Sequence, residues 1–446
     1  MRGRMGSAGG WGGAVSKTSE AGPSPRWRRS PPADAELSSG VFSLYPFPMT
    51  VLVADSVSDA ALDRLREAGH AVVDRSGLKG EALVEALAEH DPAVLVVRST
   101  RVPAEALDAS PSLELVVRAG AGVDTIDVEA ASQRGVFVAN CPGKNAAAVA
   151  ELALGLVLAL DRRIPDNVIA ARDGRWDKKG FAAARGLRGR TLGLLGLGAI
   201  GRETAARARA FGMPVVAWSR SLTDEAAREL GVTRAATPAD VARQSDVVSV
   251  HVASTPETRH LVDADVLAAM RPGAFLVNTS RAEVVDEEAV ARAIAERGLR
   301  YATDVPSGEP AAKEGEFAHP LAGDAYITHH VGASTDEATE AIGDEAARVI
   351  LTYAETGRVE NGVNLAAQTP ATHLLTVRHL DRVGVLAAVL GEVREAGWNV
   401  HEMENLVFEG AAAACARIRF DGEPDAGALA RIRAAEHVLN ATVIRL

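Results

Sequence analysis

The sequence predicts an α/β protein in which two parallel-sheet domains precede a smaller third domain. Short segments rich in β-branched residues alternate with amphipathic helical segments through most of the chain, which is the pattern of parallel sheets covered by helices on both faces. A second series of such alternations begins near residue 190, after a long apolar helical stretch. Beyond residue 370 the order changes to strand, helix, strand, strand, helix, strand, which predicts a ferredoxin-like βαββαβ unit.

Length, composition and charge narrow the class of protein. The chain has 446 residues, of which 47% are apolar, and this length suggests about three domains. The net charge of −11 argues against a nucleic-acid partner, which would need a basic face. Cys141 and Cys415 cannot form a disulfide framework and lack zinc-ligand spacing, so we expect no metal. The longest apolar stretch, residues 150–160, is too short to span a membrane. We therefore expect a cytoplasmic protein.

The first 48 residues differ from the rest in being rich in Gly, Ser, Pro and Arg without helical or strand periodicity. This composition predicts a disordered extension over residues 1–48. Its positive charges are compatible with a transit peptide. The acidic residues Glu20, Asp34 and Glu36, and Met49 directly before the first strand, instead favour a start codon assigned too early.

The predicted elements follow in order. TVLVAD, HAVVD, AVLVV, LELVV and VFVAN are expected strands, with helices such as DAALDRLREAG and EALVEALAEH between them. A long helix over about 145–160 leads to a second series of strands: TLGLLG, PVVAW, DVVSVHV, AFLVNTS, RYATDV and AYITHH. A helix near 334–357 follows. The final unit comprises HLLTVRHL, a helix from about Gly384 to Ala396, strands around Val407 and Ala414, a short helix and ATVIRL.

The strongest cofactor signal is the GxGxxG motif formed by Gly196, Gly198 and Gly201. It follows a predicted strand and opens a helix, as a Rossmann dinucleotide site requires. The first glycine allows the tight turn, the second lets backbone N–H groups approach a pyrophosphate, and the third permits close helix–strand packing. The motif therefore predicts binding of a dinucleotide.

The end of the next strand bears on the choice between NAD and NADP. A site for NAD usually presents an acidic residue there to the ribose hydroxyls, whereas this chain has Ser219, Arg220 and Ser221. A guanidinium beside hydroxyl groups can accept a 2′-phosphate, which favours NADP. The alternative is that Arg220 is an ordinary solvated arginine.

Three further polar clusters lie at strand ends of the same predicted sheet. Arg281 follows AFLVNTS, Asp304 ends RYATDV with Glu309 just beyond, and His329 and His330 end AYITHH. The carboxyl ends of parallel strands share one edge, where ligands bind in open α/β folds. An arginine can anchor a substrate carboxylate, and a histidine oriented by a carboxylate can move a hydroxyl proton. Together these groups suit hydride transfer between a hydroxyacid and a nicotinamide.

From about Thr50 to Asn364 the chain resembles the D-isomer-specific 2-hydroxyacid dehydrogenases. The resemblance rests on VRST, RAGAGVD, GLGAIGRE, VNTSRAEVVDEEA, DVPSGEP and HHVGAST. It implies that Arg281, Glu309 and His330 are catalytic. It also implies cofactor contacts by Ala199, Ile200, Thr279, Asp304, Gly332 and Ala333. The chain departs from the family pattern at Ala282, Pro306 and His329, where Gly, an aromatic residue and Pro are usual.

The same resemblance implies a flavodoxin-like substrate domain made of residues 49–145 and 334–366, and a dinucleotide-binding domain over residues 146–333. Arg98 and Arg118 follow successive strands of the first domain, and two arginines there would suit a phosphorylated substrate. Otherwise they pair with local carboxylates. The substrate contacts implied by the family are Arg98, Ser99, Arg118, Ala121, Gly122, Val123 and Asn145.

Residues 371–446 resemble an ACT domain, an amino-acid-sensing module, through HLDRVGVL and GWNV. The resemblance implies an effector site for L-serine formed by His379, Asp381 and Asn399. Asp381 and Val383 stand where Asn and Pro are usual. The alternative is a dimerisation domain that binds no ligand.

The family resemblance, together with Arg98 and Arg118, implies an enzyme that oxidises 3-phospho-D-glycerate to 3-phosphooxypyruvate, which we expect to be a homodimer or homotetramer. One alternative is another D-2-hydroxyacid activity, such as NADPH-dependent reduction of glyoxylate or hydroxypyruvate. Another is a dinucleotide-sensing corepressor without turnover.

Overall fold

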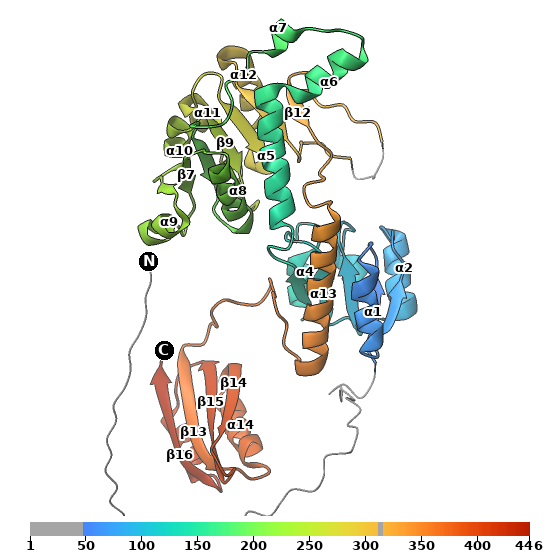
Figure 1. Cartoon of the computed structure of the whole chain (residues 1–446). Helices are drawn as coiled ribbons and strands as arrows, with labels where there is room; N and C mark the ends of the chain where they lie inside the picture. The colour runs from blue at the N-terminus through green and yellow to red at the C-terminus, as the bar shows by residue number, and fades with distance from the viewer. Residues whose placement is uncertain (1–47, 311–314) are drawn as a thin grey trace, which may run out of the picture. The chain divides into compact units, whose positions relative to one another are not determined.

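The structure is a computed structural model, and it describes residues 48–310 and 315–446. The predicted disordered extension over residues 1–48 lies outside these residues except for its last position, so it stays a prediction. Three separate sheets organise the described chain, as the sequence predicts (Figure 1).

The first sheet has five parallel strands in the order β2-β1-β3-β4-β5, which is the order of a flavodoxin-like domain. The strands are β1 (Thr50–Val53), β2 (Ala71–Asp74), β3 (Val94–Val97), β4 (Leu115–Arg118) and β5 (Phe137–Asn140). Buried residues of α1 (Asp59–Glu67) and α13 (Asp336–Thr356) pack on one face. The other face is covered by α2 (Glu81–His90), α3 (Ala104–Asp108) and α4 (Val128–Gln133). The central strands are buried on both sides, which explains their continuous runs of Val and Leu.

The second sheet has seven parallel strands in the order β12-β11-β10-β9-β6-β7-β8, a Rossmann order extended by one strand. The strands are β6 (Leu192–Leu195), β7 (Val215–Trp218), β8 (Thr233–Arg234), β9 (Val247–Val250), β10 (Phe275–Asn278), β11 (Arg300–Thr303) and β12 (Ala325–Ile327). One face packs against α5 (Ala146–Arg162), α8 (Ala199–Ala210) and α9 (Asp224–Leu230). The other packs against α10 (Pro238–Gln244), α11 (Ala264–Ala269) and α12 (Glu287–Arg297).

Two helices were not predicted: α6 (Ile164–Arg172) and α7 (Lys178–Phe181). They follow α5 and bury little, and Ala170 is the one fully buried residue that they contribute. The turn Arg281–Val285 includes a short 3₁₀ helix, η1 (Ala282–Val284).

The chain passes between the first two sheets twice. The first passage is the loop 141–145 between β5 and α5, and the second leads from β12 to α13. Thr335 caps α13 by accepting a hydrogen bond from the backbone N–H of Ala338. After α13 the chain returns to the edge of β5, where Val363 donates its N–H to Val138. The segment that follows α13 is thereby fixed to the first sheet.

The third sheet is antiparallel, in the order β14-β15-β13-β16. Its strands are β13 (His373–Leu380), β14 (Asn399–Val407), β15 (Ala413–Asp421) and β16 (Val438–Arg445). The helices α14 (Val385–Glu395) and α15 (Ala426–Ala434) follow β13 and β15 and close a core around Val389, Phe420 and Ile432. This confirms the predicted βαββαβ unit.

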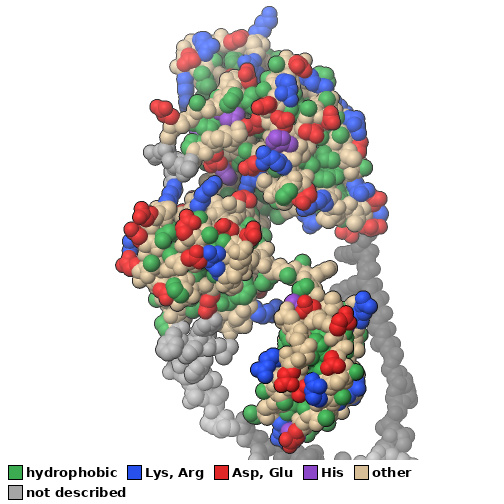
Figure 2. Space-filling model, turned by 180° about the vertical axis from the view of Figure 1, so that it is seen from behind, with side chains coloured by type: hydrophobic (Ala, Val, Ile, Leu, Met, Phe, Trp, Pro, Cys, Tyr) green, Lys and Arg blue, Asp and Glu red, His purple; other side chains and the backbone are tan. Residues whose placement is uncertain are grey.

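No helix in the described part of the chain is long and apolar enough to span a membrane. On the face seen in Figure 2, acidic and basic side chains are interspersed.

Candidate active site

The glycine loop joins β6 to α8, and two of its three glycines are required by close packing. A Cβ atom added to Gly196, where φ is 99°, would lie 2.2 Å from the backbone oxygen of His251. One added to Gly201 would lie 2.3 Å from the backbone oxygen of Gly196. A Cβ atom on Gly198 would meet nothing within 4 Å, so this position is open on the side where a ligand would approach. Ala199 and Ile200 are the first residues of α8.

A pocket of about 150 Å³ lies beside the glycine loop. It is lined by Gly196, Leu197, Gly198, Trp218, Ser219, Arg220, His251, Val252, Ala253 and Thr258. These residues follow β6, β7 and β9, at the point where the strand order reverses, which is the usual ligand position in such sheets. No lining residue is a carboxylate, and Arg220 forms no ion pair within the described residues.

His251 is a pocket residue that sequence reasoning missed. Its Nε2 lies 2.9 Å from the Ser249 hydroxyl, and its Nδ1 is buried without a partner among the residues described. Burial lowers the pKa of this imidazole to about 4, so the ring is neutral near pH 7. Its place at the end of the strand DVVSVHV was the available signal, since the other strand ends of this sheet carry site residues too.

Thr279, directly after β10, is a second residue beside the glycine loop's sheet edge with a buried polar atom that no described residue pairs. Its Oγ1 has no hydrogen-bond partner in the described part of the chain. Buried polar atoms are normally paired, so Thr279 Oγ1 and His251 Nδ1 are atoms that a ligand would satisfy. Together with the open side of Gly198, they fit a bound dinucleotide.

Asp304 is buried and organises the loop after β12. Its carboxylate accepts hydrogen bonds from the Thr328 hydroxyl (2.6 Å) and from the N–H groups of Val331 (3.0 Å) and Gly332 (2.8 Å). Its backbone oxygen accepts the N–H of His330 at 2.8 Å. These bonds hold His330 at a φ of 52°, a conformation that non-glycine residues adopt only when their surroundings impose it. The cofactor contact expected of Asp304 stays a prediction.

The predicted catalytic pair is assembled. His330 Nδ1 lies 2.8 Å from Glu309 Oε2, and the side chains retain 43% and 47% of their exposure. With the Nδ1 proton directed to the carboxylate, Nε2 is free to accept a proton. His329 is exposed and makes no side-chain hydrogen bond to the other described residues. The partner therefore distinguishes the two adjacent histidines.

Arg281 reaches the loop after β4. Its Nε donates to Asp124 Oδ2 at 2.8 Å, and its Nη1 donates to the backbone oxygen of Ser280 at 2.7 Å. A Cβ atom on Gly122 would lie 2.3 Å from Arg281 Nη2, so the guanidinium would have to shift if residue 122 carried a side chain. Sequence reasoning missed Asp124, because its pairing depends on a residue 157 positions away.

Arg118 lies against this same loop. A Cβ atom on Gly120 would lie 1.8 Å from Arg118 Nη1, and Arg118 Nε is buried and unpaired within residues 48–310 and 315–446. Burial lowers the pKa of Arg118, and the charges of Arg281 and Arg98 lower it further while Asp124 opposes them. The charges of Arg281 and Arg98 thus repel the guanidinium of Arg118, and an anionic substrate would relieve that repulsion.

The VRST segment is held by a second residue that the sequence did not single out. Asp55 Oδ2 accepts the N–H groups of Arg98, Ser99 and Thr100 at 2.7, 2.9 and 2.8 Å. Burial raises the pKa of Asp55, but these backbone donors outweigh it and the net pKa is lowered. The side chain of Arg98 donates from Nη2 to the backbone oxygen of Ala333 at 3.3 Å, three residues after His330 in the sequence.

The remaining residues expected to contact the substrate lie after β4 or in the loop 141–145, which joins β5 to α5. Ala121 accepts a hydrogen bond from the Asn140 side chain at 2.5 Å, and Val123 packs against the first domain's core. Asn145 Oδ1 is buried without a partner among the described residues. Burial raises the pKa of the neighbouring Cys141 thiol to about 12, so this cysteine is protonated near pH 7 and unsuited to act as a nucleophile.

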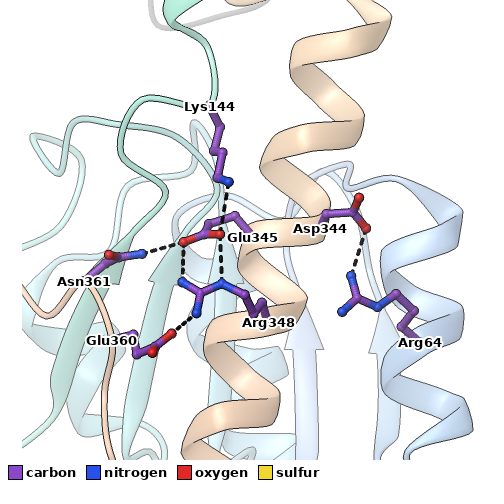
Figure 3. A network of polar contacts seen from close by, with 7 residues as sticks. All are labelled: Arg64, Lys144, Asp344, Glu345, Arg348, Glu360 and Asn361. Carbon is purple, nitrogen blue, oxygen red and sulfur yellow. Dashed lines mark hydrogen bonds and ion pairs between the residues drawn. The ribbon is translucent and has the colours of Figure 1, made fainter. Parts of the chain in front are cut away.

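A charged network ties this passage to α13 (Figure 3). Lys144 Nζ lies 3.3 Å from Glu345 Oε2, and Glu345 also accepts hydrogen bonds from Arg348 and Asn361. Arg348 in turn pairs with Glu360. Hydrogen bonds from Arg348 lower the pKa of the buried Glu345 to about 2, against the effect of burial, with Asn361 and Lys144 adding to them. The loop that carries Asn145 is therefore fixed from the side of the first domain.

The three expected effector residues do not meet within one chain. His379 pairs in register with Ala414 at the start of β15, whereas Asn399 pairs with Asp421 at its end. Seven residues of strand separate these positions by about 23 Å. Both ring nitrogens of His379 are also engaged, Nδ1 with the backbone oxygen of Leu380 and Nε2 with Asn405. Asp381 is exposed, and Asn399 lines a separate pocket with Trp398 and Arg394.

Within the described residues, no three His, Cys, Asp or Glu side chains are grouped as ligands for a metal ion.

Comparison with known proteins adds independent evidence. Residues 154–332 match the model of the NAD binding domain of D-isomer specific 2-hydroxyacid dehydrogenases. The D-3-phosphoglycerate dehydrogenase of Methanocaldococcus jannaschii is 38% identical over 318 residues, which are 71% of this chain and 59% of that protein. The chain thus spans about three fifths of the length of this curated relative.

Two solved structures share the fold. NAD⁺-bound 3-phosphoglycerate dehydrogenase from Entamoeba histolytica aligns with a TM-score of 0.60 and 28% identity, covering 71% of this chain and 99% of that one. The NADPH-dependent glyoxylate/hydroxypyruvate reductase from Sinorhizobium meliloti, in complex with NADP and malonate, aligns with a TM-score of 0.60 and 30% identity, covering 71% and 96%. The motifs, the geometry and these matches agree, and the chain belongs to the family of D-isomer-specific 2-hydroxyacid dehydrogenases.

Proposed function

We propose that the protein is a D-3-phosphoglycerate dehydrogenase, which oxidises 3-phospho-D-glycerate to 3-phosphooxypyruvate in the cytoplasm as the first step of L-serine biosynthesis. The observation that carries this proposal is the buried, unpaired Nε of Arg118, on whose guanidinium the charges of Arg98 and Arg281 also act, with Asp124 as the opposing carboxylate. A substrate with both a carboxylate and a phosphate suits that excess of positive charge. The name of the Methanocaldococcus jannaschii relative also supports it.

Each side chain has a role in this proposal. His330 Nε2 takes the hydroxyl proton, and Glu309 stabilises the imidazolium that results. Arg281 holds the substrate carboxylate, and Arg118 and Arg98 hold the phosphate. When bound, the nicotinamide dinucleotide supplies the hydride acceptor, with the glycine loop, Thr279, Gly332 and Ala333 around it.

A second candidate is an NADPH-dependent glyoxylate or hydroxypyruvate reductase. Ser219 and Arg220 favour it, because they present no acidic group to the adenosine ribose. The Sinorhizobium meliloti structure, described as such a reductase, supports it too. Two features argue against this second candidate. Arg118 suits a phosphorylated substrate, and the C-terminal domain resembles an amino-acid-sensing module. A dinucleotide-sensing corepressor remains a third reading, which any measurable turnover would remove.

The test is a panel of hydroxyacids and ketoacids, each assayed with NAD(H) and NADP(H). We expect the highest kcat/KM for 3-phospho-D-glycerate and 3-phosphooxypyruvate, whichever cofactor is used. A higher kcat/KM for glyoxylate or hydroxypyruvate would favour the second candidate. Turnover of none of these compounds would favour the third.

We further propose that the protein is a homodimer or homotetramer. α6 and the segment after it expose apolar side chains of Ile164, Val168 and Ile169, and Trp176 is 88% exposed. Such a patch is typical of a surface that a partner covers. An L-serine site that uses Asp381 of one chain and Asn399 of a second would also need an oligomer, since these residues lie apart within one chain. Analytical ultracentrifugation of the wild type and of a Trp176→Glu variant tests the assembly.

A further inference from the structure

A cluster of the buried His319, the partly buried Glu287 and the exposed Ser307 lies outside the groups assigned to catalysis, yet it touches the loop that carries Glu309. Glu287 is the first residue of α12, Ser307 stands two residues before Glu309, and His319 precedes β12. His319 Nε2 lies 3.1 Å from Glu287 Oε2 and 3.3 Å from the Ser307 hydroxyl. One histidine thus links α12 to the start of this loop.

The hydrogen bonds assign the protons in this cluster. The backbone N–H of Leu321 donates to His319 Nδ1 at 3.2 Å, so Nδ1 carries no proton and Nε2–H is the donor. Nε2–H points to Glu287 Oε2, and the backbone N–H of Ser307 reaches the same oxygen at 3.4 Å. Because Ser307 is bound through its backbone as well as its hydroxyl, the cluster restrains the path of the main chain.

Burial makes this anchor stiff. The His319 side chain is 3% exposed and that of Glu287 is 13% exposed. The ring of Phe317 stacks on His319 at 5.8 Å, and Leu321 enters the core of the second sheet. Hydrogen bonds in such low-dielectric surroundings are stronger than they are in water, and breaking one leaves a buried polar group unpaired.

Glu309 has no comparable support of its own. It is about half exposed, and the hydrogen bond of its side chain that the described residues provide is the one to His330 Nδ1. Two residues span at most about 7 Å, so a shift of Ser307 moves Glu309 with it. A misplacement of about 1 Å can cost about a hundredfold in rate.

We propose that Glu287 and His319 are positioning residues for Glu309. They hold Ser307 and thereby keep the Glu309 carboxylate against the imidazole that takes the substrate proton. This inference rests on the proposed function only in its use of the His330–Glu309 pair as the catalytic pair.

The test is a double-mutant cycle in the full-length protein. His319→Ala and Glu287→Gln should each lower kcat about ten- to hundredfold, with KM for the hydroxyacid and Kd for NADH or NADPH, measured by fluorescence, changed less than twofold. His319→Gln, whose amide can still donate to Glu287, should recover most of kcat. In a variant that already carries Glu309→Gln, His319→Ala should lower kcat almost no further. The position of the side chain at residue 309, which His319 maintains, then no longer affects the rate.

His70→Ala is the matched control, since His70 and His319 as whole residues are equally exposed, at 8%, but His70 lies in the first domain, before β2. It should lose stability without this change in kcat. If Glu309→Gln lowers kcat and His319→Ala multiplies that loss, the positioning role is refuted and the catalytic pair stands. If Glu309→Gln has no effect, the catalytic pair itself is wrong. Should His319→Ala fail to fold, Glu287→Gln and His319→Gln decide the question by the same comparison.

Discussion

At the scale of single residues, adjacent histidines acquire different roles from their partners. The backbone of His330 is held by Asp304 and its side chain is bonded to Glu309, whereas the His329 side chain makes no hydrogen bond to the other described residues. His330→Ala should therefore lower kcat about 10²–10⁴-fold, the usual contribution of a general acid–base group, with cofactor affinity retained. His329→Ala should cost far less. Steady-state kinetics of both variants, with fluorescence titration of the cofactor, distinguish them, and the reverse ranking would assign the base to His329.

Arg118 permits a prediction about the choice of substrate. Its guanidinium is partly buried with Nε unpaired among the described residues, so a bound phosphate would gain a charge-assisted hydrogen bond worth about 1.5–3 kcal/mol. Arg118→Ala should raise KM for 3-phospho-D-glycerate about ten- to hundredfold. It should raise KM for an unphosphorylated D-2-hydroxyacid much less. Equal losses on both substrates would show that Arg118 does not contact the phosphate.

Ser219 and Arg220 predict the cofactor preference. No carboxylate lines the pocket beside them, although the charge of Arg220 also acts on the nearby Glu257, so the guanidinium can bind a 2′-phosphate. We expect kcat/KM with NADP to be at least equal to that with NAD. The double substitution Ser219→Asp and Arg220→Pro should restore a preference for NAD. A wild-type preference for NAD of more than about tenfold would mean that Arg220 serves only as a solvated side chain.

At the scale of elements, the Glu345 network should link α13 and the loop before α5 to the stability of the protein. The pKa of Glu345 falls from an ordinary value of 4.5 to about 2 on folding, so the stabilisation is full above pH 4.5 and is lost as the pH falls toward 2. Glu345→Gln should lower the free energy of unfolding by about 2 kcal/mol near neutral pH. That difference from wild type should shrink below pH 4.5, as followed by urea unfolding at several pH values.

Asp344→Asn is the matched control for Glu345→Gln. Asp344 lies on the same helix and pairs with Arg64 of α1, but its side chain is 62% exposed (Figure 3). An exposed ion pair contributes at most about 1 kcal/mol and is screened by salt. The control should therefore change stability much less than Glu345→Gln does. Equal effects of the two variants would indicate that burial of Glu345 is not what gives the network its strength.

At the scale of the whole molecule, regulation by L-serine would depend on assembly. Asp381 and Asn399 lie near opposite ends of β15, so a shared ligand requires two chains. We expect L-serine to slow the oligomer, and Asn399→Ala to abolish this inhibition while leaving basal kcat unchanged. For inhibition to occur, L-serine must bind the less active state more tightly. Calorimetry that detects no binding at millimolar L-serine would leave the C-terminal domain an assembly module.

The sequence by itself predicts those elements that are marked by neighbouring residues, such as an uninterrupted apolar run or a glycine motif. The central strands of the first two sheets are buried, mostly apolar runs, and the glycine motif follows one of them, so pattern and position together predict the nucleotide loop. By contrast, β8 consists of Thr233 and Arg234, both exposed, and exists because it pairs with β7. α6 and α7 bury too little to leave a helical periodicity that the sequence would reveal.

The residues of the candidate site also fall into two groups, those that the sequence predicts and those that only tertiary contacts reveal. Strand ends predict that Arg281, Glu309 and His330 gather at one edge, because the carboxyl ends of parallel strands coincide. The sequence could not reveal that Asp124 pairs with Arg281, that Asp55 holds Arg98, or that His319 anchors the Glu309 loop, since these partners are distant along the chain. Such contacts leave no periodic pattern. The sequence by itself therefore determined which groups are candidates for the chemistry, and the tertiary structure decided which groups hold them in place.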